Sequence, residues 1–268
     1  RSPFYPMAML TSTILAIDNH ILMPQNHIIE HLRAHQSIRK FTTQAVPQAQ
    51  LEECIAAGQA ASSSSFVQVT SVIQVNNPSA RASLAQAAGG QAYVESAAVF
   101  LVFCADLHRN QKICELEQQV IPTGFVEQTL IGTVDTALFA QNVMLAAQSE
   151  GLGGVFIGGL RNQPTEVSKL LNLPEQVYPV FGMCLGYPDQ DPGPKPRLPV
   201  ACVLHQDQYQ AIDADSLADY NQTLSDYYLQ RTQGKSSLNF SQHIIKTVTK
   251  EARPHMLPYL QSQGLVTR

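Results

Sequence analysis

The chain has 268 residues, of which 44% are hydrophobic and 14% charged, and its formal net charge is −4. This composition supplies a sizeable core and excludes a disordered polyelectrolyte. The lack of a basic excess argues against a nucleic-acid-binding protein, although local basic groups can still bind a phosphate.

The five cysteines indicate free thiols rather than a disulfide framework. Their number is odd, no C-x-x-C pair occurs, and Cys104, Cys184 and Cys202 lie within apolar runs, where a thiol behaves as a small hydrophobic group. We therefore expect a reducing compartment, the cytoplasm. No apolar run approaches the roughly 20 residues that span a bilayer, so no membrane partner is expected.

The first half of the chain alternates helix and strand signals. Residues 1–24 are interpreted as an N-terminal extension and 25–268 as a single domain. A helix is predicted over about 47–60, because Pro47 suits a first turn and apolar residues then recur on one face. The alternating segment 66–75 predicts a half-buried strand, and the continuous apolar run 97–104 predicts a central one.

The second half begins with a long apolar helix over about 123–150, whose hydrophobic residues on nearly every face indicate a core or an oligomer interface. Five prolines between 188 and 199 predict an extended loop. The other predicted elements are strands 153–157, 177–185 and 201–204 and helices 167–171, 215–230 and 241–264, the last interrupted at Pro254. This mixed order favours an α+β or α/β fold with one sheet between helices.

One motif suggests a metal site. His27 to His31 matches the H-x-x-E-H pattern of zinc proteases, and His35 follows at a further helical step. On one helix these three imidazoles would share a face and could bind zinc, as in a zinc-dependent hydrolase. The alternative is a polar, exposed helix whose histidines are spaced by chance, and no further ligand is evident elsewhere.

Two segments offer anion-binding groups. In His35-Gln36-Ser37-Ile38-Arg39 the guanidinium of Arg39 and the hydroxyl of Ser37 suit a phosphate. Lys195 and Arg197 flank Pro196 on an extended backbone, where side chains two residues apart point to the same side. The alternatives are an ordinary polar helix end and a solvated basic loop.

Three further segments are rich in small residues. Glycines between Gly153 and Gly159 would let a flat ligand approach the backbone, or would serve tight packing. The serine run 62–65 is by itself a flexible loop, and Gly89-Gly90-Gln91 by itself is a turn. The basic stretch 231–235 could bind the 2′-phosphate of NADPH or be a plain surface loop.

Taken in order, these segments resemble the nitroreductase family, specifically its oxygen-insensitive NADPH nitroreductase and NADPH-flavin oxidoreductase subgroup. The resemblance runs from about His31 to Arg268. The chain departs from the family pattern at Gln36, where an arginine is usual, and at Phe156, where a tyrosine is frequent. It also carries a few extra residues around 114–124, interpreted as a loop insertion.

The resemblance implies an α+β fold with a mostly antiparallel sheet flanked by helices, an interlaced homodimer, and FMN bound at the subunit interface. The residues that would contact FMN are His35, Gln36, Ser37, Arg39, Ser63, Ser65, Gln91, Phe156, Ile157, Gly158, Gly159, Lys195 and Arg197. Those that would bind NADPH are Arg231, Lys235 and Arg253. No metal site is implied.

The implied activity is two-electron transfer from NADPH through FMN to nitroaromatics, quinones or free flavin in a ping-pong scheme. Because the cofactor carries the chemistry, no catalytic acid or base is expected among the side chains. A flavin-binding protein without turnover remains an alternative.

Overall fold

The computed structural model describes residues 27–250 and 252–268, so the predicted extension 1–24 lies outside the described residues. Within them the centre is one antiparallel sheet of four strands in the order β1-β2-β4-β3. The strands are β1 (Thr70–Gln74), β2 (Val99–Asp106), β3 (Gly153–Ile157) and β4 (Val177–Gly186). The predicted α+β class with an antiparallel sheet is therefore confirmed.

The central strand β2 is buried along its whole length, as its apolar run predicts. Its side chains alternate between two cores: Phe100 and Val102 belong to one hydrophobic cluster, and Leu101 and Phe103 to the other. The register with β4 shifts between Phe103 and Cys104, which is a local bulge. Helices must therefore cover both faces of the sheet.

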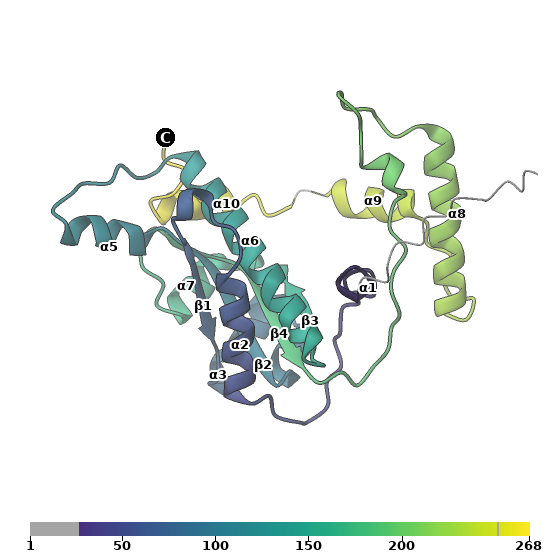
Figure 1. Cartoon of the computed structure of the whole chain (residues 1–268), viewed down its shortest axis with the longest axis horizontal. Coiled ribbons are helices and arrows are strands. Elements are labelled where there is room, and N and C mark those ends of the chain that lie inside the picture. The colour runs from purple at the N-terminus through teal and green to yellow at the C-terminus, as the bar shows by residue number, and fades with distance from the viewer. Residues whose placement is uncertain (1–26, 251) are drawn as a thin grey trace, which may run out of the picture.

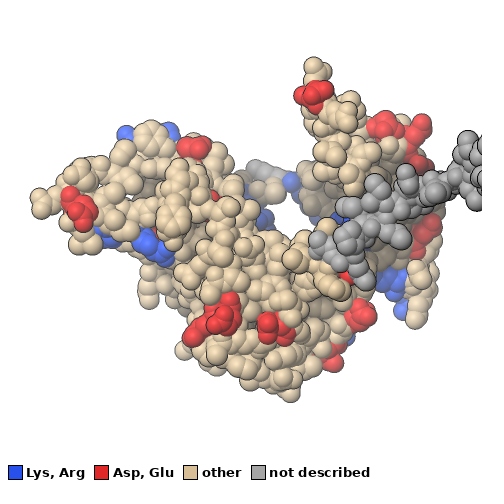
Figure 2. Space-filling model, in the orientation of Figure 1, with Lys and Arg blue, Asp and Glu red and all other residues tan. Residues whose placement is uncertain are grey.

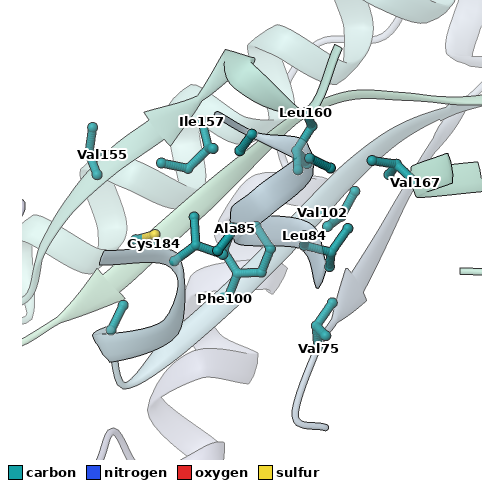
Figure 3. Packing of buried hydrophobic residues seen from close by; sticks show 14 of the residues in the cluster. Val75, Leu84, Ala85, Phe100, Val102, Val155, Ile157, Leu160, Val167 and Cys184 are labelled. Carbon is teal, nitrogen blue, oxygen red and sulfur yellow. The ribbon is translucent and has the colours of Figure 1, made fainter. Parts of the chain in front are cut away.

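One face is covered by α2 (Gln48–Gln59) and α6 (Val126–Ser149), which pack against each other. They cross closely at Gly58, where a Cβ atom would lie 2.5 Å from the Phe139 ring. The other face is covered by α3 (Pro78–Ala87), α4 (Tyr93–Ser96) and α7 (Pro164–Leu170). Figure 3 shows the core on this face, where Phe100 lies beside Ala85 and Leu84, and Leu160 and Val167 belong to the same cluster.

Among the described residues, helix α6 has the length and the apolar composition of a membrane-spanning helix. It packs against α2 and all four strands, and it buries the polar side chains of Asp135 and Thr136. We therefore interpret it as a core helix.

The segment after β4 leaves the sheet and forms an arm. It runs through the proline-rich loop into α8 (Ala214–Arg231) and α9 (Phe240–Val248), then returns to α10 (Met256–Ser262) beside the sheet. Figure 1 shows α8 and α9 standing apart from the sheet body, and Figure 2 shows an opening between the two parts. Short helices α1 (His27–Arg33) and α5 (His108–Leu116) complete the chain.

Three local predictions need correction. The strand predicted from residue 66 begins only at Thr70, because Phe66 and Gln68 adopt positive φ angles that interrupt extended backbone. The edge strand predicted at 201–204 is wrong, since Val200–Cys202 forms a 3-10 turn after Pro199. The insertion predicted as loop begins inside α5, which continues to Leu116.

Candidate functional site

A cavity of about 180 Å3 lies where the chain's first described segment meets the arm. The residues that line it are His35, Gln36, Ser37, Arg39, Pro192, Gly193, Lys195, Arg197 and Arg231. Four of these side chains are Lys or Arg, and the described residues of the lining include no carboxylate. The cavity therefore has the charge that an anion such as a phosphate requires.

The first wall is fixed by backbone pairing with the sheet. Ile38 donates its N–H to the Gly154 carbonyl at 2.9 Å, and its side chain is buried. Ser37 forms an isolated bridge to Gly154, and Phe41 forms another to Pro188. Because Ile38 points into the core, its neighbours Ser37 and Arg39 are left at the cavity.

The second wall is held by α8. The Tyr220 hydroxyl donates to the Pro196 carbonyl at 3.0 Å, and the Lys195 ammonium lies 5.2 Å from the centre of the Tyr228 ring. These contacts place Lys195 and Arg197 opposite Arg39. Arg231 comes from the end of α8, where its guanidinium donates to the Tyr227 hydroxyl at 2.5 Å.

The donor set fits the phosphate and polyol chain of FMN. The cations and the Ser37 hydroxyl suit the phosphate, as expected from the sequence. The Gln36 Oε1 atom is buried and has no hydrogen-bond partner among the described residues, so it can accept from a ribityl hydroxyl. Gln36 thus offers an acceptor where the nitroreductase family usually has an arginine, and Arg231 adds a cation that the first segment lacks.

The glycines of the 153–159 segment serve two different purposes. At Gly153 a Cβ atom would lie 2.5 Å from the Ile38 side chain, and at Gly154 it would lie 2.7 Å from the Cys184 carbonyl. These two positions are explained by packing. At Gly158 the nearest group is the flexible end of Arg161 at 3.3 Å, which leaves the backbone accessible to a ligand.

Gly159 lies against Gln91. A Cβ atom at Gly159 would be 2.6 Å from the Gln91 amide nitrogen and 2.4 Å from the Ala88 carbonyl. The Gln91 amide donates to Ala88 at 2.7 Å and accepts from the Tyr93 hydroxyl at 2.6 Å. The structure therefore brings Gln91, Gly158 and Gly159 together, as the predicted flavin site requires.

Two predicted contact residues point into the cores instead. Ile157 is almost completely buried, and Phe156 packs edge-on against Phe181 with ring centres 5.2 Å apart. The Ile157 side chain is therefore closed to a ligand, whereas that of Phe156 remains partly exposed.

The predicted serines lie elsewhere in the monomer. Ser63 lines a separate cavity of about 70 Å3 together with Asp135 and Arg109, and Ser65 is exposed. The chain does not bring Ser63 and Ser65 to the cationic cavity by itself.

The three residues predicted to bind NADPH are not gathered into one cluster. Arg231 lines the cationic cavity, whereas Arg253 donates to the Asn162 side chain at 2.9 Å, directly after the glycine segment. Lys235 is exposed in the turn after α8, where its N–H donates to the Thr232 carbonyl at 3.2 Å.

Arg161 is a cation near this site that the sequence analysis did not single out. Its guanidinium donates to the Val180 carbonyl, and its own carbonyl lies 2.9 Å from His255 Nε2. Burial lowers the pKa of Arg161, and the charge of Arg253 lowers it further. Its place directly after Gly158-Gly159-Leu160 is the signal that could have identified it.

The histidine pattern does not form a zinc site. Helix α1 ends at Arg33, so His35 does not continue the helical face that His27 and His31 were expected to share. His27 lies 3.7 Å from Glu30, and His35 Nδ1 lies 3.0 Å from the Gln148 amide. Over residues 27–250 and 252–268 no three His, Cys, Asp or Glu side chains are grouped to hold a metal ion, and the zinc-hydrolase alternative gains no support.

Comparison with known proteins agrees with this geometry. Residues 32–187 match the model of the nitroreductase family, and residues 195–268 match that of the nitroreductase family C-terminal domain. Among the relatives is an "NADPH-flavin oxidoreductase" of Vibrio harveyi, 50% identical over 91% of this chain and 100% of its own length. Another is an "Oxygen-insensitive NADPH nitroreductase" of Salmonella typhimurium, 48% identical over 90% of this chain and 98% of its own.

Solved structures show the same likeness. An NADPH:FMN oxidoreductase from Vibrio harveyi complexed with NAD+ superposes with a TM-score of 0.84 at 49% identity, covering 91% of this chain and 100% of that one. NfrA1 of B. megaterium superposes with a TM-score of 0.87 at 39% identity, and the match covers 90% of this chain and 100% of that one. The chain therefore belongs to the nitroreductase family.

Proposed function

We propose that this chain is an FMN-dependent oxidoreductase that uses NADPH for the two-electron reduction of nitroaromatics, quinones or free flavin. The cationic cavity carries the proposal, because it joins Arg39, Lys195 and Arg197 from two distant segments around a space for one phosphate. The names of the Vibrio harveyi and Salmonella typhimurium relatives agree with the same activity. When bound, FMN would supply the two-electron redox chemistry that links NADPH to the acceptor.

The side chains would bind and orient the cofactor. Arg39, Lys195 and Arg197 would hold the phosphate by charge-assisted hydrogen bonds, while Ser37 would donate to it. Gln36 would accept from the ribityl chain, and His35 lines the same wall. The bare backbone at Gly158 and Gly159 would approach the ring, with Gln91 beside it.

The remaining predicted contacts need a second subunit. We infer a homodimer in which Ser63 and Ser65 of one protomer reach the flavin held by its partner. Helix α6 supports this inference, because it exposes a stripe of apolar side chains at steps of four residues. The stripe consists of Val126, Leu130, Val134 and Leu138.

Residues 25–268 would act as one FMN-binding domain, since the cavity takes lining residues from both segments that match the two family models. Arg231, Lys235 and Arg253 would bind NADPH, with Arg231 as the contact to the 2′-phosphate. The cytoplasm would be the working compartment, which agrees with buried free thiols and a nicotinamide reductant.

Reconstitution of the purified protein with FMN tests the proposal. We expect a yellow protein that NADPH bleaches without oxygen, and parallel lines in double-reciprocal plots of initial rate, as a ping-pong scheme requires. A protein that binds no FMN overturns the proposal. A yellow protein that NADPH does not bleach points instead to a flavin-binding protein without turnover.

A further inference from the structure

The serine loop, residues 62–68, has an unusual backbone conformation. Ser65, Phe66 and Gln68 have φ angles of 47°, 59° and 51°, in the left-handed region. For residues other than glycine each such conformation costs on the order of 1 kcal/mol and persists only where surrounding contacts impose it. Within the loop the Gln68 N–H donates to the Ser63 hydroxyl at 2.8 Å, and contacts from α6 and α5 add support from outside.

The first of these contacts is the carboxylate of Asp135 on α6. Asp135 is only 4% exposed, yet it accepts from the Ser63 hydroxyl at 2.9 Å and from the Ser64 N–H at 3.1 Å. In the part of the chain that the structure describes, the ion pairs use other carboxylates. A buried carboxylate is costly unless it is hydrogen-bonded, and here both donors come from the serine loop.

The second contact holds the end of the loop from α5. Arg109 donates to the carbonyls of Gln68 at 3.0 Å and Thr70 at 3.2 Å, and it pairs with Asp106 at 3.2 Å. The Asn110 amide donates to the Val67 carbonyl at 3.1 Å. The turn at Ser64–Phe66 is thus held on both sides while its own side chains stay exposed.

We propose that Asp135, assisted by Arg109, is a positioning residue that presets the serine loop for the flavin of the partner subunit. The proposal rests on the proposed function, in which Ser63 and Ser65 contact FMN across the dimer. Because the loop is already ordered, FMN binding would not have to supply the free energy of ordering it. Asp135 would act through Ser63 and Ser64, without touching the cofactor.

The test compares FMN dissociation constants of the wild type, Asp135→Asn, Ser63→Ala and the double variant, by quenching of flavin fluorescence on titration into apoprotein. Asparagine keeps the side chain's size and removes the charge that the two donors share. We expect about a tenfold rise in Kd for Asp135→Asn, the effect of losing one charge-assisted hydrogen bond. The effects of the two changes on the free energy of FMN binding should be less than additive, because each removes the hydrogen bond between the Ser63 hydroxyl and Asp135.

Melting temperatures of the apoproteins separate positioning from general stability. Glu166→Gln is the matched control, because it removes a carboxylate of α7 that pairs with the exposed Lys169. Asp135→Asn could lower the melting temperature and yet leave the FMN Kd unchanged at a temperature where the variant is folded. That result would overturn the positioning role. Fully additive effects on Kd also overturn it, since Asp135 would then act by another route.

Arg109→Lys provides a second measurement if Asp135→Asn does not fold. It keeps the charge opposite Asp106 but loses the forked donation to Gln68 and Thr70, and it should raise FMN Kd severalfold. An unchanged Kd for Arg109→Lys counts against the proposal. A wild-type apoprotein that binds no FMN would instead refute the proposed function.

Discussion

Gly159 and Gln91 fit together so closely that the glycine leaves no room for a side chain. A Cβ atom at Gly159 would lie 2.6 Å from the Gln91 amide nitrogen, which itself donates to Ala88 at 2.7 Å. The turn after α3 and the turn after β3 therefore form one surface. A ring that lies on this surface meets backbone atoms and the Gln91 amide together.

Gly159→Ala should reduce both stability and FMN content. The added methyl group must displace the Ala88 carbonyl or Gln91, and overpacking of this kind costs about 1–3 kcal/mol. For a chain of this size each kcal/mol lowers the melting temperature by about 2–4 °C. Gly158→Ala is the control for stability, because its Cβ atom would meet only the movable end of Arg161 at 3.3 Å. Equal losses of melting temperature in the two variants would contradict the argument.

Arg197→Ala should weaken FMN binding but leave riboflavin binding unchanged. Arg197 lines the cavity assigned to the phosphate, which riboflavin lacks. Loss of a charge-assisted hydrogen bond predicts a rise in FMN Kd of about tenfold or more. Titration of apoprotein with each flavin measures both constants. A parallel weakening of riboflavin would mean that Arg197 acts on the ring or on the fold.

Arg231→Ala should raise the KM for NADPH about tenfold or more while changing that for NADH little, if Arg231 binds the 2′-phosphate. Because Arg231 also lines the cationic cavity, loss of its contact with the FMN phosphate would instead weaken FMN binding. Steady-state kinetics with each nucleotide and FMN titration distinguish the two roles. Lys246→Ala removes an exposed cation of α9 and serves as the control. A rise in FMN Kd with an unchanged preference for NADPH over NADH would show that Arg231 binds the flavin phosphate and not the 2′-phosphate of NADPH.

Leu130→Glu should convert the inferred homodimer to monomers. Leu130 is 54% exposed in the middle of the apolar stripe of α6, and a buried, unpaired carboxylate there would oppose association. Size-exclusion chromatography with light scattering gives the mass at micromolar concentration. Val120→Glu is the control, since Val120 is 95% exposed in the loop before α6. A wild type that is monomeric under these conditions would rule out the dimer.

Stability should fall as pH rises from about 9 to 12. Burial raises the pKa of Cys104 from 9.0 to about 12, with a further contribution from the Asp106 charge. Burial likewise raises the pKa of Cys184 to about 12, although the charge of Arg81 acts in the opposite direction. Between about pH 9 and 12 the thiols of the unfolded chain release protons, whereas those of the folded chain retain them. Each of the two cysteines therefore lowers the free energy of unfolding by about 1.4 kcal/mol per pH unit.

Denaturant unfolding at pH 8, 9, 10 and 11 measures this dependence. Cys184→Ala should be less stable than the wild type at pH 8, because it leaves a cavity, but its stability should fall less steeply above pH 9. Cys104→Ala should show the same change of slope. Unchanged slopes in both variants would contradict the assignment to buried thiols.

The sequence by itself determined the elements that depend on local pattern. The uninterrupted apolar run around Phe100 and Val102 predicts a strand buried on both faces, and β2 is that strand. The all-round apolar segment ending near Gly151 predicts a helix buried in a core or an oligomer interface, and α6 is that helix, with one face in the core. The polar or alanine-rich helices α3 and α5 were not predicted, because their hydrophobic periodicity is weak.

Only the tertiary structure decided which residues meet. Ser37 and Arg39 face Lys195 and Arg197 because Ile38 pairs with Gly154 and α8 holds the proline-rich loop. Likewise, the serine run looks like a flexible loop until Asp135 is seen to hold it. Side-chain periodicity records which face of an element is buried, whereas proximity between distant segments depends on long-range hydrogen bonds and packing that no local pattern encodes.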